Sequence, residues 1–248
     1  ISDLLFTKMA VSGSFNKDVF IKNGAKEKQL EITGMPIHDS IYDKLSESVN
    51  IDLLNELGLE PENRNILLLT HPDTQFGSEQ IRKKILRCMF QSIKKLPRVN
   101  LIIKPHPNET DGFVQSEVAK SLLDNVAVID AIEVLYDIIH LCNVAVTTFN
   151  STSSIEAVLF GKPVLIINFT GNINSIKCAR EGVAIEIKET EKVYESLNEL
   201  LNNQDLLSSL RNRRKQFIEK YAYKLDGKST RRVVDVVQEL VESRNNVN

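Results

Sequence analysis

Short apolar runs alternate with amphipathic segments along most of the chain. From residue 65 onward, runs of strand-forming residues bounded by turn residues recur between segments with helical spacing. In chain order, the expected strands contain NILLLT, VNLIIK, VAVID, VAVTTF, PVLIIN and VAIEI. Buried strands that alternate with helices predict a parallel sheet covered on both faces. The pattern therefore predicts a doubly wound, Rossmann-like α/β domain.

The expected helices fill the segments between these strands. They are predicted over residues 78–96, 114–123, 132–141 and 174–181, with a short additional helix that stops at Gly161. A glycine just past the last apolar helical position is a common helix stop signal.

The two ends of the chain depart from this alternation. Residues 1–60 predict two short strands with connecting helices, followed by the polar segment GLEPENRN, and are expected to be the end of a preceding domain plus a linker. Residues 61–248 are expected to form the α/β domain with its C-terminal helices. Within it, residues 189–244 carry helical stripes of leucine and valine that break near residues 226–228.

Composition narrows the class of protein. The chain has 248 residues, 42% of them hydrophobic, and a net charge of -2, so no strong field favours nucleic acid or a membrane surface. The apolar runs are far shorter than the roughly 20 residues that a transmembrane helix needs, so we expect no transmembrane helix. The three cysteines are widely separated and form no CxxC pair, which argues against disulfides and zinc. We expect a cytoplasmic protein.

Polar turns follow three of the expected strands. THPDTQFGS follows the first strand, KPHPNE the second and TTFNSTSS the fourth. In the common strand order 3-2-1-4-5-6, the first and fourth strands flank the crevice where open α/β sheets bind ligands, and the second lies beside the first. All three polar turns are therefore expected to meet at one place.

Two of these turns carry a histidine directly before a proline. His71 and His106 each take an extended backbone for this reason, and His106 is bracketed by Pro105 and Pro107, with Lys104 before them. A single histidine of this kind often only caps a backbone carbonyl. Two of them on adjacent strand ends favour a site, because an imidazole can donate to a phosphate oxygen or neutralise a leaving diphosphate.

The third turn concentrates hydroxyl groups at the start of the short helix. Ser153 and Glu156 have the spacing of a capping box, which would account for the acid without any further role. Capping does not account for Asn150, Ser151 and Thr152. Small polar residues at a helix start suit an anion, although no GxGxxG or Walker sequence is present.

Together these motifs resemble the C-terminal, donor-binding half of GT-B glycosyltransferases, in the superfamily that includes the non-hydrolysing UDP-N-acetylglucosamine 2-epimerases. IIKPHPNE resembles the histidine motif of capsule and teichoic-acid polymer transferases, and TTFNSTSSIEAVLFGKPVLI resembles the nucleotide-sugar motif. LLLTHPDTQFG is similar to the first strand and loop of that half, and DGKSTRRVVDVV to the closing helix of the epimerases. The resemblance covers nearly the whole chain.

The resemblance implies a nucleotide-activated sugar, or a CDP- or CMP-activated donor, as substrate. It implies no tightly bound cofactor, no metal ligands, a glycan or polymer acceptor, and an N-terminal GT-B domain as partner. Glu156 would bind the ribose, and the hydroxyls of the third turn would face the phosphates. The residues expected to bind the donor are His71, Lys104, Asn150, Ser151, Thr152, Ser153 and Glu156, and the expected catalytic residue is His106.

Two departures from the epimerase pattern bear on the reaction. Epimerases usually have two glycines where this chain has Ser151 and Thr152, and His-Arg where it has His71 and Pro72. These differences favour a transferase of surface polysaccharide or glycoconjugate synthesis. An epimerase-like isomerase and a non-catalytic nucleotide-binding or interaction module are the alternatives.

Overall fold

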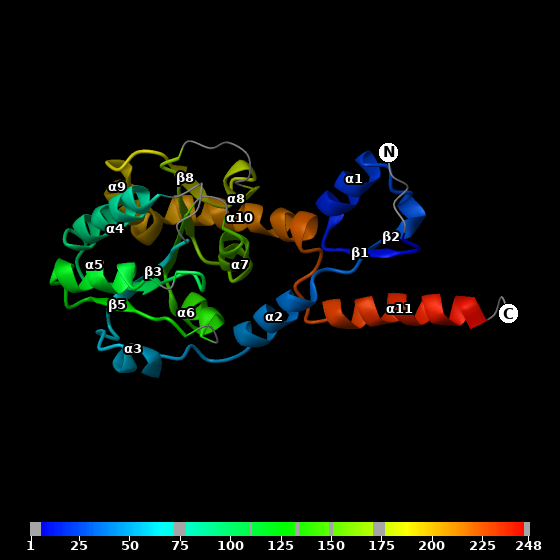
Figure 1. Cartoon of the computed structure of the whole chain (residues 1–248), viewed down its shortest axis with the longest axis horizontal. Coiled ribbons are helices and arrows are strands. Elements are labelled where there is room, and N and C mark those ends of the chain that lie inside the picture. Colours follow the sequence, from blue (N-terminus) through cyan, green and yellow to red (C-terminus); the bar gives the residue numbers. More distant parts are fainter. Residues whose placement is uncertain are drawn as a thin grey trace. The chain divides into compact units, whose positions relative to one another are not determined.

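A computed structural model describes residues 6–71, 78–109, 111–131, 134–148, 151–170 and 177–245 (Figure 1). The chain folds into two compact units. One comprises Ile1–Glu47 and Arg214–Asn248, and the other comprises Ser48–Arg213. No helix in the described part of the chain combines the length and apolar character needed to cross a membrane.

The larger unit is built on a six-stranded sheet in which every strand pair is parallel. The strands are β3 (Arg64–Leu69), β4 (Val99–Lys104), β5 (Val126–Val128), β6 (Val144–Thr148), β7 (Val164–Ile167) and β8 (Ile185–Ile187). Their order in the sheet is β5-β4-β3-β6-β7-β8. This is the predicted order 3-2-1-4-5-6, so the doubly wound α/β fold is confirmed.

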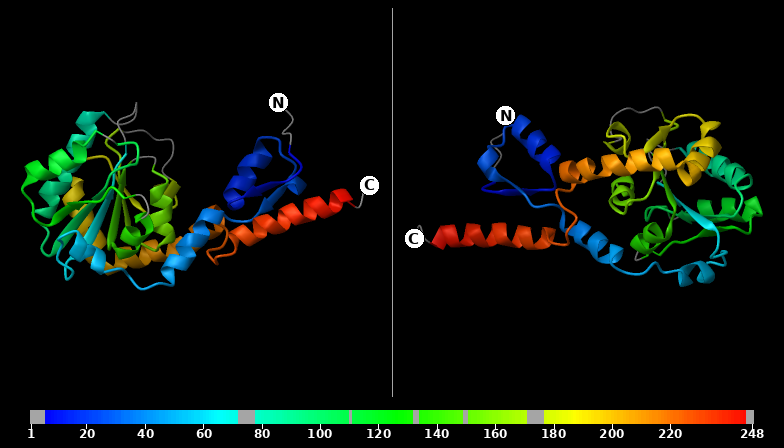
Figure 2. Two further views of the ribbon diagram at one scale, coloured as in Figure 1. Left: turned by 60° about the horizontal axis from the view of Figure 1, so that its bottom comes forward. Right: turned by 180° about the vertical axis from the view of Figure 1, so that it is seen from behind.

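Helices cover both faces of this sheet (Figure 2). The helices of this unit are α3 (Asp52–Glu56), α4 (Glu79–Ile93), α5 (Phe113–Ser121), α6 (Leu135–Leu141), α7 (Ser153–Leu159), α8 (Lys177–Arg180), α9 (Lys192–Asn202) and the start of α10 (Gln204–Tyr221). α4 packs against α9, α6 contacts β3, and α7 contacts β6 and β7. Because both faces are covered, the central strands are apolar at almost every position instead of alternating.

The packing of the hydrophobic core explains why the strands and helices could be predicted from the sequence. Ile66 and Leu68 of β3 are fully buried and share one hydrophobic cluster with α4 and α9. In α4 the buried Ile85, Met89 and Ile93 recur every four residues, which places them on the face turned to the sheet. α7 ends as predicted: Gly161 has φ +78°, a conformation that glycine adopts without strain.

The smaller unit contains two short parallel strands, β1 (Met9–Val11) and β2 (Leu30–Ile32). Its helical elements are α1 (Ser14–Lys22), η1 (Glu27–Gln29), η2 (Pro36–His38), α2 (Asp39–Leu45), the end of α10 (Gln204–Tyr221) and α11 (Ser229–Asn245). The two short strands agree with the sequence prediction for the start of the chain. The break between α10 and α11 includes the predicted residues 226–228.

The division of the chain differs from the predicted boundary near residue 60. The prediction placed all C-terminal helices with the large sheet, whereas residues 214–248 group with residues 1–47. The carboxylate of Asp39 accepts hydrogen bonds from the backbone N–H groups of Ser229 at 2.9 Å and Thr230 at 2.8 Å. Arg232 Nε donates to the carbonyl oxygen of Thr33 at 2.7 Å. Hydrophobic periodicity carries no signal for such polar contacts.

Candidate functional site

The sheet register brings three strand ends to one level. Leu69 of β3 pairs with Lys104 of β4 on one side and with Thr147 of β6 on the other. The residues that follow these positions therefore lie along one carboxyl edge of the sheet, at the point where the strand order reverses. This is the predicted meeting place of the polar turns.

A pocket opens at this edge, and we refer to it as the edge pocket. Its cavity volume is about 80 Å³. It is lined by Leu69, Thr70, Lys104, Pro105, His106, Pro107, Leu135, Ser151 and Ser153. Four residues predicted to bind or act on the donor thus line one cavity.

Lys104 brings a buried cation into the wall of the edge pocket. Only 5% of the residue is exposed, and its Nζ lies 3.3 Å from the carbonyl oxygens of both Pro105 and Asp130. A buried positive charge at a pocket wall attracts an anion more strongly than the same charge in water, because screening by solvent is weaker there.

His106 is exposed, and a backbone contact defines which of its nitrogens can donate. Its Nδ1 accepts a hydrogen bond from the backbone N–H of Asn108 at 3.1 Å. In the neutral ring, the nitrogen that accepts carries no proton, so the proton is on Nε2. The imidazole therefore has a hydrogen-bond donor, Nε2–H, to offer to a ligand.

The turn before α7 does not form the predicted capping box. Thr152 is the N-cap residue, no side chain caps the helix, and Ser153 is the first helical residue. Ser154 Oγ donates to the carbonyl oxygen of Ser151 at 2.8 Å instead. The prediction was wrong because the helix starts one residue earlier than the capping-box register requires. The side chain of Ser153 is consequently at the pocket and not engaged as a cap.

Glu156 contacts a neighbouring helix and not the backbone N–H of Ser153, which a capping box requires. Its Oε1 accepts a hydrogen bond from the hydroxyl of Tyr136 on α6 at 3.1 Å. Burial raises the pKa of Glu156, and the Tyr136 hydrogen bond opposes that rise. Burial and the neighbouring carboxylate likewise raise the pKa of Tyr136. The Tyr136 ring packs edge-on against Phe160, with ring centroids 5.4 Å apart.

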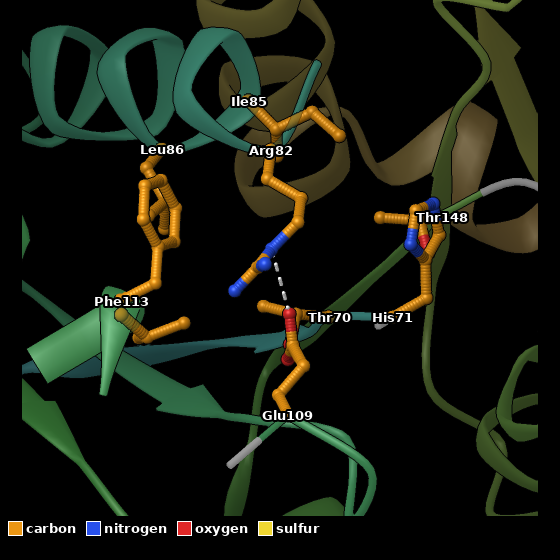
Figure 3. Close-up of a pocket in the computed structure, with 9 residues that line it drawn as sticks. Thr70, His71, Arg82, Ile85, Leu86, Glu109, Phe113 and Thr148 are labelled. Atoms are coloured by element: carbon orange, nitrogen blue, oxygen red, sulfur yellow. Dashed lines mark hydrogen bonds and ion pairs between the residues drawn. The ribbon is translucent and has the colours of Figure 1, made fainter. Parts of the chain in front are cut away.

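A second pocket lies next to the edge pocket and shares Thr70 with it (Figure 3). We call it the histidine pocket because His71 lines it. Its cavity volume is about 10 Å³, which is room for about one water molecule. Its lining residues are Thr70, His71, Arg82, Ile85, Leu86, Glu109, Phe113, Val114 and Thr148. The Thr148 hydroxyl is buried and has no hydrogen-bond partner among the residues that the structure describes.

The predicted site residues thus do not all line one pocket. Lys104, His106, Ser151 and Ser153 line the edge pocket, and His71 lines the histidine pocket. Thr152 is exposed at the start of α7, and Glu156 faces Tyr136. Asn150 lies outside the described residues.

Sequence reasoning missed three residues of this region. Glu109 lies within the KPHPNE turn but had no assigned role, and Arg82 and Tyr136 lie within helical segments where a polar side chain gives no distinct signal. Among the described residues, no group of three or more histidine, cysteine, aspartate or glutamate side chains could hold a metal ion.

Comparison with solved structures places this fold among known enzymes. A UDP-GlcNAc 2-epimerase from Neisseria meningitidis bound to UDP-GlcNAc superposes with a TM-score of 0.71 at 17% identity, covering 94% of this chain and 62% of that one. The S. aureus MnaA-UDP co-structure gives 0.72 at 15% identity, covering 95% and 60%. The wall teichoic acid polymerase TagF gives 0.67 at 10% identity, covering 96% and 58%.

At these identities the likeness concerns the fold, and the chain spans about 60% of the length of these proteins. A search of curated proteins gave no match. The family model described as UDP-N-acetylglucosamine 2-epimerase matches residues 1–238, nearly the whole chain. The protein therefore belongs to the UDP-N-acetylglucosamine 2-epimerase family.

Proposed function

We propose that the edge pocket binds the phosphates of a nucleotide-activated donor, and that the chain serves a GT-B transferase of surface polysaccharide or glycoconjugate synthesis. One observation carries this proposal. A buried lysine, a histidine donor and two serine hydroxyls line a single cavity at the switch point of a doubly wound sheet.

The chemistry of these groups suits a leaving diphosphate. When the bond to the transferred group breaks, its electron pair stays on a phosphate oxygen, which gains negative charge. The Lys104 ammonium and the Nε2–H of His106 can stabilise that charge, and Ser151 and Ser153 can donate further hydrogen bonds. α7 has only seven residues, so we assign the electrostatic contribution to these side chains and not to a helix dipole.

Glu156 is proposed to receive the ribose. The Tyr136 hydroxyl occupies Oε1, which leaves Oε2 to accept a hydrogen bond from a ribose hydroxyl. α7 carries both Ser153, at the pocket, and Glu156 three residues on, at the spacing of neighbouring positions on one helix face. Phosphate and ribose groups would thus contact one helix.

The ligands named for proteins of the same fold support a nucleotide. UDP-GlcNAc is bound to the Neisseria epimerase, UDP to MnaA, and CDPG was soaked into a TagF variant. A nucleoside diphosphate group is common to the first two. We therefore choose UDP and CDP as the probes for this chain.

An epimerase-like isomerase is the second candidate, because the matched family model describes UDP-N-acetylglucosamine 2-epimerases. The transferase is favoured by the turn sequences. Ser151 and Thr152 replace the two glycines of that family's usual pattern, and Pro72 follows His71 in place of arginine. The products separate the two reactions: an isomerase returns an altered nucleotide sugar, whereas a transferase releases the nucleotide.

Thermal unfolding with UDP, CDP, CMP and GDP at millimolar concentration tests the proposal. A ligand at ten times its dissociation constant stabilises the native state by about 1.4 kcal/mol, which gives a visible shift in melting temperature. We expect UDP or CDP to raise the melting temperature. Superimposable curves with all four nucleotides would contradict a donor site in this chain.

A further inference from the structure

The turn that carries His106 is closed by a glutamate within the same turn. The backbone N–H of His106 donates to Oε2 of Glu109 at 2.9 Å, and the backbone N–H of Glu109 donates to the carbonyl oxygen of His106 at 2.7 Å. The Thr70 hydroxyl, at the end of β3, donates to the same carboxylate oxygen. Glu109 therefore links the turn after β4 to the end of the neighbouring strand.

This carboxylate is buried, although the turn it closes is exposed. The Glu109 side chain is 1% exposed and forms an ion pair with Arg82 of α4, with Nε and Oε1 3.0 Å apart (Figure 3). Arg82 is itself held in place. Its two terminal nitrogens lie 2.9 Å and 3.2 Å from the carboxylate of Asp111, and its guanidinium stacks 4.4 Å from the ring centre of Phe113.

A buried ion pair of this kind is poorly explained by stability alone. Desolvating two charges offsets most of their attraction, and well-packed apolar residues often stabilise a fold as much. A planar guanidinium whose two terminal nitrogens donate to Asp111 and which lies over the Phe113 ring keeps its Nε at a defined distance from Glu109, because its donors form a rigid fork. The pair is therefore suited to holding the His106 turn at a defined place on the sheet edge.

We propose that Glu109 and Arg82 are positioning residues for His106. Through the backbone of the His106 turn they aim Nε2–H of the imidazole into the edge pocket, where it meets a phosphate oxygen. This inference rests on the proposed nucleotide site and assigns that site two residues outside the edge pocket itself. Neither residue lines the edge pocket.

The first readout needs no ligand. The chain has four histidines, so ¹⁵N-histidine labelling gives few backbone and imidazole signals. Glu109→Gln preserves the shape of the side chain and removes its charge. We expect the His106 backbone amide signal to move, its hydrogen exchange to accelerate, and its imidazole nitrogen signals to shift. The matched control is Glu117→Gln, which breaks the ion pair between Glu117 and Lys120 on α5. It should leave these signals in place.

The second readout is affinity for UDP and CDP by calorimetry. We expect Glu109→Gln to weaken binding roughly five- to tenfold, about the effect of one neutral hydrogen bond. In a His106→Ala background, Glu109→Gln should cause no further loss, because it acts through the imidazole. Arg82→Lys keeps the positive charge but loses the fork, and should reproduce the effect if Glu109→Gln does not fold.

The outcomes separate this inference from the proposed function. Failure of the wild-type chain to bind UDP or CDP contradicts the nucleotide site, and the histidine signals of the free protein then test the positioning role alone. A folded Glu109→Gln or Arg82→Lys variant with unchanged His106 signals overturns the inference. An equal loss of affinity with and without the imidazole also overturns it.

Discussion

The hydroxyl of Tyr136 donates a hydrogen bond of 3.1 Å to Oε1 of Glu156. This contact joins α6 to α7, two helices that precede and follow the same strand, β6. Because the Tyr136 hydroxyl, a neutral donor, holds one carboxylate oxygen, the orientation of the Glu156 carboxylate is fixed. The carboxylate is therefore prepared for a second hydrogen bond, which we assign to a ribose.

Tyr136→Phe should weaken nucleotide binding while preserving the fold. The change removes one hydrogen bond, worth about 1 kcal/mol, and leaves the ring packed against Phe160. The pKa of Glu156 should rise further, because the lost hydrogen bond favours the carboxylate. We expect roughly fivefold weaker binding by calorimetry, with a larger deficit at lower pH. Tyr194→Phe, at a half-exposed ring on α9, is the control, and equal affinities of the two variants would argue against the role of Tyr136.

Glu156→Gln should stabilise the protein at pH 7 although it weakens nucleotide binding. Burial raises the folded-state pKa of Glu156 above its ordinary value of 4.5. A raised carboxyl pKa means that the folded state binds the proton more tightly, so the unfolding free energy falls as pH rises from 4.5 through the raised pKa. The neutral amide avoids this loss, and the two proteins should converge below pH 4.5.

Urea unfolding between pH 4 and pH 8 measures this difference. Glu195→Gln is the matched control, since it removes only a surface ion pair with Lys192 and should change the unfolding free energy by less than about 1 kcal/mol. A Glu156→Gln variant that is less stable than wild type at pH 7 would show that the ionised carboxylate stabilises the fold.

His106→Gln should retain more nucleotide affinity than His106→Asn. The Nδ1 atom accepts from the Asn108 backbone, so the donor available to a phosphate is at the ε position of the ring. A glutamine amide reaches approximately that position, whereas an asparagine amide reaches only the δ position. Calorimetric titration of the two variants with UDP and CDP tests this order. The reverse order would mean that the ring donates through Nδ1.

Asp39→Ala should loosen α11 in the smaller unit. Burial acts to raise the pKa of Asp39, but hydrogen bonds from Thr230 and Ser229 hold it below its ordinary value of 3.8. Its stabilisation is therefore present above pH 3.8 and lost as the pH falls through the lowered pKa. Asp39 thus caps the start of α11, and losing this cap should lower the unfolding free energy by about 1 kcal/mol at neutral pH. Hydrogen exchange in α11 should accelerate at pH 7. The control is Asp43→Ala, a change at an exposed residue of α2, the short helix that also carries Asp39, and it should leave exchange in α11 unchanged.

The strand order and the place of the site could be predicted from the sequence. Apolar runs such as that of β3 are long enough to mark buried strands, and polar turns at their carboxyl ends meet once the strand order is known. The ion pair of Arg82 with Glu109 could not be predicted in this way. Its partners are far apart in sequence and lie in a helix and a turn, so no local spacing relates them.

The capping-box prediction shows a second limit. Ser153 and Glu156 have the required spacing, but the helix begins with Ser153 itself, and the acid contacts Tyr136 on another helix. Helix ends shift by one or two residues with tertiary context, and a one-residue shift is enough to remove a cap. The motif located the helix correctly and gave the wrong partner for its acid.

Calorimetric titration of the chain with UDP, CDP and their nucleosides tests the central claim most directly, because it asks whether phosphates are bound at the edge pocket. We predict that a nucleoside diphosphate binds and that its nucleoside binds far more weakly. Lys104→Met should lower the diphosphate affinity roughly tenfold or more, as expected for loss of a charge-assisted contact. Lys162→Met, which removes a half-buried lysine that donates to the His140 carbonyl outside the pocket, should not. Equal diphosphate affinities of wild type and Lys104→Met, or no binding of either diphosphate to wild type, would contradict the account.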